Sequence, residues 1–314
     1  MKKTVAIITA LLLAFAMLAA CGSDPTDDSN PASGSNPATG SDPDPGTSNN
    51  GTTTDPGFDF DTDRVIAVFT REDGSGTRDA FVSITGVGDD MYIEAVVLDQ
   101  TAQVLTSVET NEYGIGYVSV GSLSPNVKAL VINGVTPSND TIKDGSYALQ
   151  RPFLLVVNDD KNSDELVTDF IEFVLSKQGQ ETIGSTWTSS VEEGDQKDYE
   201  SSGLSGVLKV GGSTSVEPFM LRLREAYVAL NPGIEIEISG GGSGAGISEA
   251  TDGVIDIGMS SRNLRDTEQH LNSFTIALDG VAVIVNSVNP INEMTIEQVK
   301  DIFTGDVTRW SGLN

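Results

Sequence analysis

Apolar positions divide the 314-residue chain into three parts. Residues 5–20 are almost all apolar and follow a basic start, but the run is too short for a comfortable membrane span and instead predicts a secretory signal over residues 1–20. Residues 21–63 are mainly Ser, Asp, Asn, Pro, Thr and Gly, with Phe58 and Phe60 as the only aromatic residues. Because this stretch cannot bury enough apolar surface to offset the entropy of ordering it, we expect a disordered acidic tether.

From residue 65 onward, strand-like and helix-like patterns alternate over about 250 residues, which predicts an α/β fold. A polar segment at 192–206 separates two groups of these elements. The strand-like runs are 66–69, 115–120, 128–132, 153–157, 207–210, 234–238, 254–259 and 281–285. The helix-like runs are 79–84, 163–176, 218–230 and 295–303, and a short helix is expected to follow the glycine-rich stretch 240–246.

Three of the predicted strands pass through a loop of Gly, Ser and Thr into a predicted helix. These loops are 74–77, 212–215 and 242–246. A helix start offers free backbone N–H groups and the positive end of the helix dipole, and glycine lets the backbone approach a ligand closely. Each loop alone has a plain alternative, namely a tight turn with a helix cap. Together the three loops predict a site for an oxyanion.

The overall charge is opposite to what an anion site suggests. The chain has 46 Asp and Glu against 18 Lys and Arg, a formal net charge of −28, and nothing in it forms a basic stripe for nucleic acid. Backbone dipoles and neutral hydroxyls can nevertheless bind an oxyanion locally, and salt screens distant carboxylates beyond ~8 Å at physiological ionic strength. One arginine would then be enough as the formal counter-charge.

The only cysteine, Cys21, directly follows the apolar run in the sequence Leu18-Ala19-Ala20-Cys21-Gly22. This pattern resembles a bacterial lipoprotein signal, which implies a diacylated Cys21 that tethers the chain to the outer face of a membrane. The alternative is a plain signal peptide with an incidental cysteine. With one cysteine, no disulfide can form within the chain.

Several short stretches of the folded part together carry a family resemblance. They are Arg71–Arg78 (REDGSGTR), Ile115–Ser119, Gln150–Phe153, Gly212–Pro218 (GSTSVEP), Ser239–Gly246, Asp256–Arg262, and Phe303–Gly305 with Trp310. In these stretches the chain resembles the periplasmic-type phosphate-binding proteins of the Pst uptake system. The resemblance covers nearly everything from residue 65 to residue 314.

The two halves of the folded part come in the opposite order from that of the family. The family's second half comes first, at 65–195, and its first half follows, at 207–314. This order predicts a circular permutant whose old termini are joined through 192–206, and the rival explanation is a truncated or misassembled chain. The resemblance implies a two-lobed periplasmic-binding-protein-like fold with a ligand cleft. One lobe would combine 65–149 with 284–314, and the other would be 150–283.

The resemblance also implies the ligand contacts. Some family members have an aspartate where this chain has Ser261; a carboxylate there would reject fully ionised sulfate, so this substitution leaves the choice of anion open. Arg71 would be the charge partner, able to make a forked contact, and its alternative is a surface ion pair with Glu72 or Asp73. Arg262 is either a ligand contact or the partner of a nearby acid, and Arg78 is expected to be structural. The implied phosphate contacts are Arg71, Ser75, Gly76, Thr77, Thr214, Ser215, Ser243 and Ser261.

The resemblance implies a lipid-anchored receptor on the extracytoplasmic face of the cell membrane. It would be a monomer that captures inorganic phosphate for an ABC transporter permease, without cofactor or metal. The alternatives are a receptor for sulfate or molybdate, a phosphatase on the same scaffold, and a permuted protein that no longer closes. Against the phosphatase, the only histidine, His270, lies in a polar run with no metal-ligand cluster around it.

Overall fold

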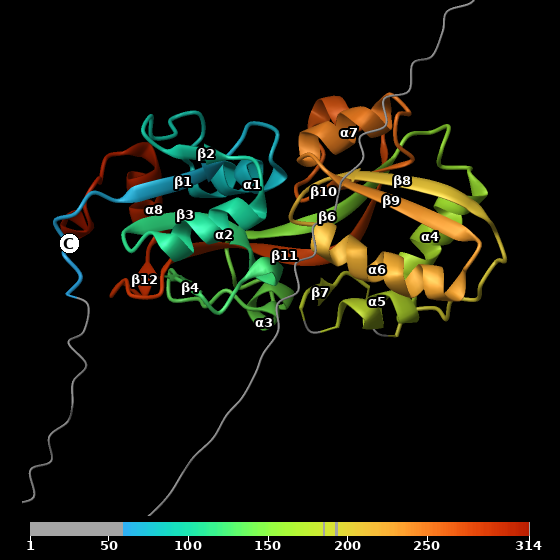
Figure 1. Ribbon diagram of the computed structural model, residues 1–314, viewed down its shortest axis with the longest axis horizontal. Coiled ribbons are helices and arrows are strands. Elements are labelled where there is room, and N and C mark those ends of the chain that lie inside the picture. The colour runs from blue at the N-terminus through green and yellow to red at the C-terminus, as the bar shows by residue number, and fades with distance from the viewer. Residues whose placement is uncertain (1–58, 185, 192–193, 314) are drawn as a thin grey trace, which may run out of the picture. The chain divides into compact units, whose positions relative to one another are not determined.

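One mixed sheet runs through the residues that the computed structural model describes, which are 59–184, 186–191 and 194–313 (Figure 1). Its strands follow the order β2-β1-β3-β11-β6-β10-β8-β9, while β4 and β7 pair with β11 outside this path and β5 pairs with β12. The predicted signal segment, Cys21 and nearly all of the predicted tether lie outside the described residues. The strands are β1 (Ala67–Arg71), β2 (Val96–Leu98), β3 (Gly114–Ser119), β4 (Val127–Ala129), β5 (Val131–Ile132), β6 (Gln150–Val157), β7 (Thr188–Ser189), β8 (Gly206–Gly212), β9 (Ile234–Gly240), β10 (Ile257–Ser260), β11 (Asn272–Asn286) and β12 (Glu293–Met294).

Helices α1 and α8 begin and end at residues that cap them. Ser75 accepts the N–H of Arg78 at the start of α1, and Thr295 forms a capping box with Gln298 at the start of α8. Both helices end at a glycine in the left-handed conformation, Gly86 and Gly305. The helices are α1 (Gly76–Thr85), α2 (Thr101–Thr110), α3 (Asn139–Lys143), α4 (Glu165–Leu175), α5 (Lys177–Ile183), α6 (Glu217–Leu230), α7 (Ser243–Thr251) and α8 (Ile296–Thr304), with short 3-10 turns at Val120–Ser122, Asp266–Glu268 and Trp310–Gly312.

Strand β11 joins the two halves of the sheet. Its first part, 272–280, pairs antiparallel with β6, and its continuation, 281–285, pairs antiparallel with β3. Near the change of partner, Asp279 accepts a hydrogen bond from Ser119 Oγ at 2.8 Å and forms an ion pair with Arg151 Nη2 at 2.9 Å. These three side chains are buried and link β3, β6 and β11 where the sheet passes from one half to the other. This passage therefore contains a paired charge as well as apolar contacts.

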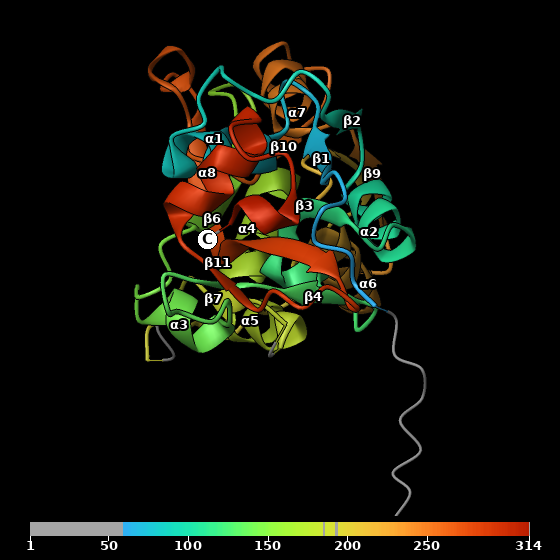
Figure 2. The ribbon, with the colours of Figure 1, turned by 90° about the vertical axis from the view of Figure 1, so that its left-hand side faces the viewer.

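The half of the sheet around β1 and β3 carries one set of hydrophobic cores. We call this part lobe A; it comprises β1–β5, β12, α1–α3, α8 and residues 281–286 of β11. Figure 2 shows α1 and α8 on one side of β1 and β3, and α2 on the other. Alternation along β1 places Val68 in the cluster with Phe81 of α1, and Phe69 in the cluster with Val104 and Val108 of α2.

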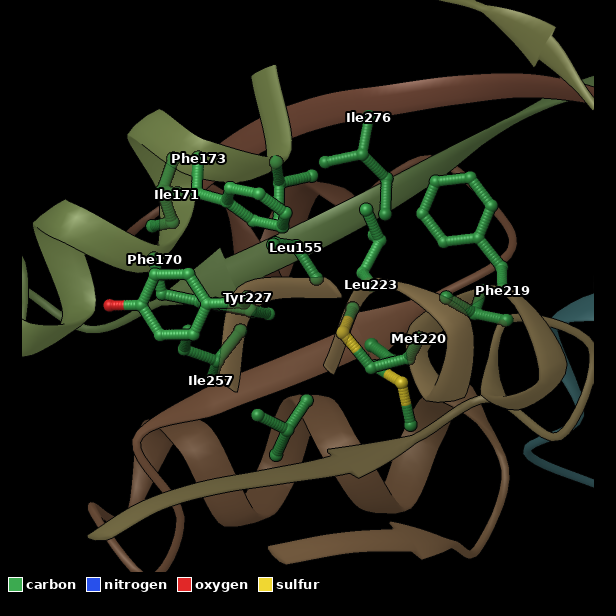
Figure 3. Packing of buried hydrophobic residues seen from close by; sticks show 14 of the residues in the cluster. Leu155, Phe170, Ile171, Phe173, Phe219, Met220, Leu223, Tyr227, Ile257 and Ile276 are labelled. Carbon is green, nitrogen blue, oxygen red and sulfur yellow. The ribbon is translucent and has the colours of Figure 1, made fainter. Parts of the chain in front are cut away.

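The other half of the sheet has its own core. We call it lobe B; it comprises β6–β10, α4–α7 and residues 272–280 of β11. Figure 3 shows the side chains of α4 and α6 packed over the sheet, among them Phe170, Phe173, Met220 and Tyr227. Helix α7 packs on the opposite face through Ile247 and Ala250. The prediction of a mixed α/β fold is confirmed.

Several of the predicted elements have wrong limits. The strand predicted over 128–132 is two short strands, β4 and β5, which pair with β11 and β12 in separate sheets because the chain changes partner after Ala129. Helix α1 begins at Gly76, within the glycine-rich loop, and not at residue 79. The strand predicted over 254–259 begins only at Ile257, because the N–H groups of Val254 and Ile255 bond to Glu249 O in a turn that follows α7. The strand predicted over 281–285 is the end of β11, which starts at Asn272.

The predicted tether extends too far. Phe60 packs against Tyr113 and Trp310, with ring centroids 5.0 and 6.0 Å apart, and Ser311 N donates to Thr62 O at 2.8 Å. Residues 60–62 therefore belong to the folded part. In the part of the chain that the structure describes, no helix has both the length and the apolar character needed to cross a membrane.

Candidate functional site

The ends of β1, β8 and β10 and the starts of α1 and α7 lie where lobe A meets lobe B (Figure 1). Within lobe A, β1 runs parallel to β3, and within lobe B, β8 runs parallel to β10, so each lobe has its strand ends and the helix starts that follow them at one edge. The two edges meet at the lobe boundary, which carries all of the predicted ligand contacts, and all of them are buried: Arg71, Ser75, Gly76, Thr77, Thr214, Ser215, Ser243 and Ser261.

Direct hydrogen bonds connect the predicted residues across the two lobes. Arg71 Nη2 of lobe A donates to Thr214 Oγ1 of lobe B at 3.1 Å. The hydroxyls of Thr77 and Ser215 lie 2.8 Å apart. The backbone follows the same path, since Gly244 N donates to Gly74 O at 2.9 Å. The structure therefore has the two lobes in contact through the residues that the sequence placed in the ligand cleft.

Lobe B comes very close to Gly76, the first residue of α1. A Cβ added at Gly76 would lie 2.2 Å from Ser243 Oγ and 2.7 Å from Ser261 Oγ. On the lobe B side these serines are held together, because Ser243 Oγ accepts the N–H of Ser261 at 3.1 Å and Ser213 Oγ donates to Ser261 Oγ at 2.9 Å. Any residue with a side chain at this position would clash with these serines, so only glycine fits there.

Arg71 is a buried cation with many partners. Its guanidinium pairs with Glu72, with Nε–Oε2 and Nη2–Oε1 distances of 2.9 Å, and it also donates to Leu98 O at 3.1 Å and Asp99 O at 2.9 Å. The ion pair with Glu72 that was considered as an alternative is thus present, but at a side chain that is only 2% exposed and not at the surface. The pair orients the guanidinium and leaves Nη1 and Nη2 in contact with hydroxyls.

Two other residues of the same loop have local partners. Ser75 Oγ caps α1 by accepting the N–H of Arg78 at 3.4 Å. The side chain of Arg78 forms an ion pair with Asp73, whose own side chain is exposed. Ser75 therefore contributes to the site through the position of the helix start.

Arg262 is paired with acids. Its Nε lies 2.8 Å from Asp79 Oδ2 of lobe A, and its Nη1 lies 2.7 Å from Glu268 Oε2 of lobe B. The hydrogen bond from Arg262 lowers the pKa of Glu268 and outweighs its burial, which would raise that pKa. Of the two roles considered for Arg262, the structure has the acid pair, and this pair spans the two lobes.

Tyr117 of β3 is hydrogen-bonded to the backbone of Arg71. Its hydroxyl lies 2.8 Å from Thr70 Oγ1 and accepts the N–H of Arg71 at 3.1 Å. Burial raises the pKa of Tyr117 to about 12, despite the hydrogen bonds that lower it. The phenol is therefore neutral at physiological pH and adds no negative charge beside the site.

Two residues that the sequence analysis did not name also lie in the site. Thr101 Oγ1, at the start of α2, lies 3.2 Å from Arg71 Nη1 and 3.2 Å from Thr214 Oγ1. Ser213 is bonded to Ser261 as described above. Ser213 lies inside a recognised loop and could have been included, whereas no motif in the sequence marks Thr101.

The donors of this site suit a ligand that accepts hydrogen bonds. Hydroxyls and a guanidinium can hold an oxyanion reversibly without any covalent step. Within the described ranges, no group of three or more His, Cys, Asp or Glu side chains could hold a metal ion. His270 is exposed, with Nδ1 3.2 Å from Thr267 O, and the hydrogen bonds of the described residues do not connect it to the predicted ligand contacts.

The fold is that of a solute-binding protein, and comparison with known proteins agrees. The family model described as "PBP superfamily domain" matches residues 55–178 and 189–313. "Phosphate-binding protein PstS 2" of Streptococcus pneumoniae serotype 4 is 44% identical over 255 residues, which are 78% of this chain and 86% of that relative. The chain therefore belongs to the PBP superfamily and, within it, to the family of phosphate-binding proteins named PstS.

Two further matches differ in extent. The crystal structure of a phosphate-binding protein of a phosphate ABC transporter from Streptococcus pneumoniae TIGR4 is 42% identical, has a TM-score of 0.66, and covers 80% of this chain and 100% of that one. "Phosphate-binding protein PstS" of Bacillus subtilis is 31% identical over only 113 residues, which are 35% of this chain and 38% of that relative.

Proposed function

We propose that this chain is an extracytoplasmic solute-binding protein that captures inorganic phosphate and delivers it to the permease of an ABC transporter. The observation that carries the proposal is the buried set of donors at the lobe boundary, in which Arg71 and Thr77 of lobe A contact Thr214 and Ser215 of lobe B. An anion held by both sets of donors would favour the state in which the lobes are together. The names of the relatives describe binding proteins for phosphate and not enzymes.

The local chemistry supports an oxyanion despite the acidic composition. The starts of α1 and α7 both lie at the site, and backbone N–H groups at a helix start favour negative charge. Arg71 supplies the formal positive charge, and Glu72 neutralises part of it without occupying Nη1. Such short-range donors act on a bound anion far more strongly than screened carboxylates elsewhere on the surface.

Sulfate is a second candidate ligand, favoured by the surroundings of Ser261. The side-chain partners of Ser261 are the hydroxyls of Ser213 and Ser243, at 2.9 and 3.4 Å. A hydroxyl can donate or accept, so this corner of the site can receive a protonated or a fully ionised oxyanion. A phosphate receptor with relaxed discrimination against sulfate is the expected result.

We also propose that the chain is a monomer anchored through a diacylated Cys21, with residues 22–58 as the tether. The position of Cys21 directly after the apolar run supports the anchor, although both lie outside the described residues. Release of a Cys21→Ser variant from the membrane fraction of the producing cells tests the anchor, and retention of that variant contradicts it.

Calorimetric titration tests the binding proposal. We expect the purified protein to take up phosphate in a one-to-one complex, and the Arg71→Ala variant to bind at least about 100-fold more weakly, since a buried charge-assisted contact contributes about 1.5–3 kcal/mol and its loss leaves Glu72 unpaired. Arg78→Ala is the matched control, because Arg78 lies in the same loop but pairs with Asp73.

A second titration with sulfate measures discrimination. Sulfate binding within about 100-fold of phosphate binding would agree with the hydroxyl environment of Ser261. A folded wild-type protein that binds neither anion, or equal phosphate affinity in the wild type and the Arg71→Ala variant, would contradict the proposal.

A further inference from the structure

Thr101, the first residue of α2, lies at the centre of the hydroxyl cluster. Its side chain is 6% exposed. Oγ1 is 3.2 Å from Arg71 Nη1, 3.2 Å from Thr214 Oγ1 and 3.3 Å from Ser215 Oγ. Thr101 thus contacts the cation of lobe A and two hydroxyls of the lobe B loop 212–215, which no other side chain in the described part of the site does.

The direction of these hydrogen bonds lets Thr101 turn its hydrogen toward a ligand. A guanidinium only donates, so Thr101 Oγ1 accepts from Arg71 Nη1, and Thr214 Oγ1 accepts from Nη2. The hydrogen of Thr101 is shared with the neighbouring hydroxyls of Thr214 and Ser215. Ser215 Oγ also has a closer partner in Thr77 Oγ1, at 2.8 Å. An anion oxygen beside these hydroxyls could therefore replace one of them as the acceptor of the Thr101 hydrogen, without breaking the bond from Arg71.

We propose that Thr101 is a further ligand-binding residue of this site, whose hydroxyl donates to the same tetrahedral oxyanion that Arg71 holds. This inference rests on the proposed function, since it assigns one more contact to the same ligand. The hydroxyl has two effects at once: it accepts from Nη1 and so fixes the plane of the Arg71 fork, and it donates to an anion oxygen beside that fork. Each of these two hydrogen bonds is strong because its other member, the guanidinium or the anion, is charged.

The competing explanation is that Thr101 only completes the hydrogen bonding of Arg71. The two explanations differ in what the removal of the hydroxyl changes. If Thr101 only supports Arg71, its loss leaves a buried guanidinium nitrogen without a partner and lowers the stability of the ligand-free protein. If Thr101 contacts the ligand, its loss changes the affinity for the anion more than the stability of the ligand-free protein.

The test compares Thr101→Val with Thr101→Ser. Valine keeps the branched shape and removes the hydroxyl, whereas serine keeps the hydroxyl and removes the methyl group. Each protein is titrated with phosphate and with sulfate, and each is melted without and with saturating phosphate. We expect Thr101→Val to bind phosphate about tenfold or more weakly, as for the loss of a hydrogen bond to a charged group, and Thr101→Ser to stay within about threefold of the wild type.

The outcomes separate this inference from the proposed function. Wild-type binding, the expected loss of affinity in Thr101→Val but not in Thr101→Ser, and a smaller rise of the melting temperature with phosphate in Thr101→Val support the inference, whether or not the melting temperature without ligand falls. Equal phosphate affinity in Thr101→Val and the wild type overturns the inference and leaves the proposed function in place. A melting temperature that falls without ligand while affinity is kept also overturns it, in favour of a supporting role. A wild type that binds neither anion overturns the proposed function and this inference together.

Discussion

Gly76 is the residue on which contact between the lobes depends most directly. The start of α1 approaches Ser243 and Ser261 so closely that a Cβ there would lie 2.2 Å from the hydroxyl oxygen of Ser243. Such a contact forces either the serine or the whole lobe to move, and the serine is fully buried. The glycine is required by the neighbouring lobe and not by its own backbone, because its φ is not in the left-handed region.

This geometry gives a prediction for Gly76→Ala. We expect phosphate affinity to fall at least about 100-fold, because the added methyl group keeps the lobes apart, while the melting temperature without ligand stays the same or rises, because alanine favours the helix by up to about 1 kcal/mol. Calorimetry and thermal melting measure the two effects. Gly241→Ala is the control, since a Cβ there would meet only Ala245 Cβ, at 3.6 Å. Unchanged affinity in Gly76→Ala would mean that the bound state does not bring α1 against α7.

The candidate site could be predicted from the sequence only where a motif marks it. Arg71, Thr77, Thr214 and Ser215 lie in recognisable Gly, Ser and Thr loops, and they meet at the lobe boundary. Thr101 belongs to no such loop, and its role depends on the place that the fold gives to α2. The choice between two roles for Arg262 also needed the structure, because its partner Asp79 is far away in the sequence.

At the scale of elements, prediction succeeded where apolar residues are dense. Helix α4 has Val167, Phe170, Phe173 and Val174 buried on one face, and its predicted limits are close to those observed. Helix α2 was missed because Val104, Leu105 and Val108 are its only large apolar residues, among Thr, Gln, Ser and Glu. The first part of β11 was missed because it begins with two polar residues and contains Asp279, whose burial depends on Arg151 from another strand.

A group of ion pairs joins α1 of lobe A to the turn after β10 of lobe B, and we call this group, formed by Asp79, Arg262, Arg265 and Glu268, the clasp. Asp79 of α1 forms ion pairs with both Arg262 and Arg265, and Arg262 is held from the other side by Glu268. None of these residues belongs to the hydroxyl cluster. The clasp should therefore contribute to how long the lobes stay together and not to the recognition of the anion.

We expect Asp79→Asn to release phosphate about three to ten times faster than the wild type at low ionic strength, with a smaller difference at high salt, because the lost pairs are partly exposed and salt screens them. Stopped-flow measurement of phosphate release at two salt concentrations checks this. The control is Asp256→Asn, which removes an ion pair with Lys161 inside lobe B. Equal release rates in Asp79→Asn and the wild type at low salt would show that the clasp has no effect on opening.

At the scale of the whole molecule, the exchanged order of the two halves stays a prediction. The Streptococcus pneumoniae relative matches over 86% of its length, whereas the Bacillus subtilis relative matches over only 38% of its length. The segment proposed to join the old termini packs on lobe B, where Tyr199 donates to Asp169 Oδ2 at 2.7 Å and Lys177 N donates to Lys197 O at 2.8 Å.

The two lobes share a single sheet through β11 and β6, so loops from both halves of the chain can meet at one site. Lobe A takes its core from both ends of the described chain, while lobe B is continuous from β6 to the first part of β11. The crossing is fixed by Ser119, Arg151 and Asp279, so opening and closing would turn about these strands.

The most direct test of the central claim is a crystal structure of the protein grown with saturating phosphate. We predict one tetrahedral anion at the lobe boundary, in contact with Arg71 and Thr77 from lobe A and with Thr214 and Ser215 from lobe B. The hydroxyl contacts that now join the lobes directly would then pass through the anion. Crystals in which the Arg71–Thr214 contact persists unchanged, with phosphate bound elsewhere or nowhere, would contradict the claim.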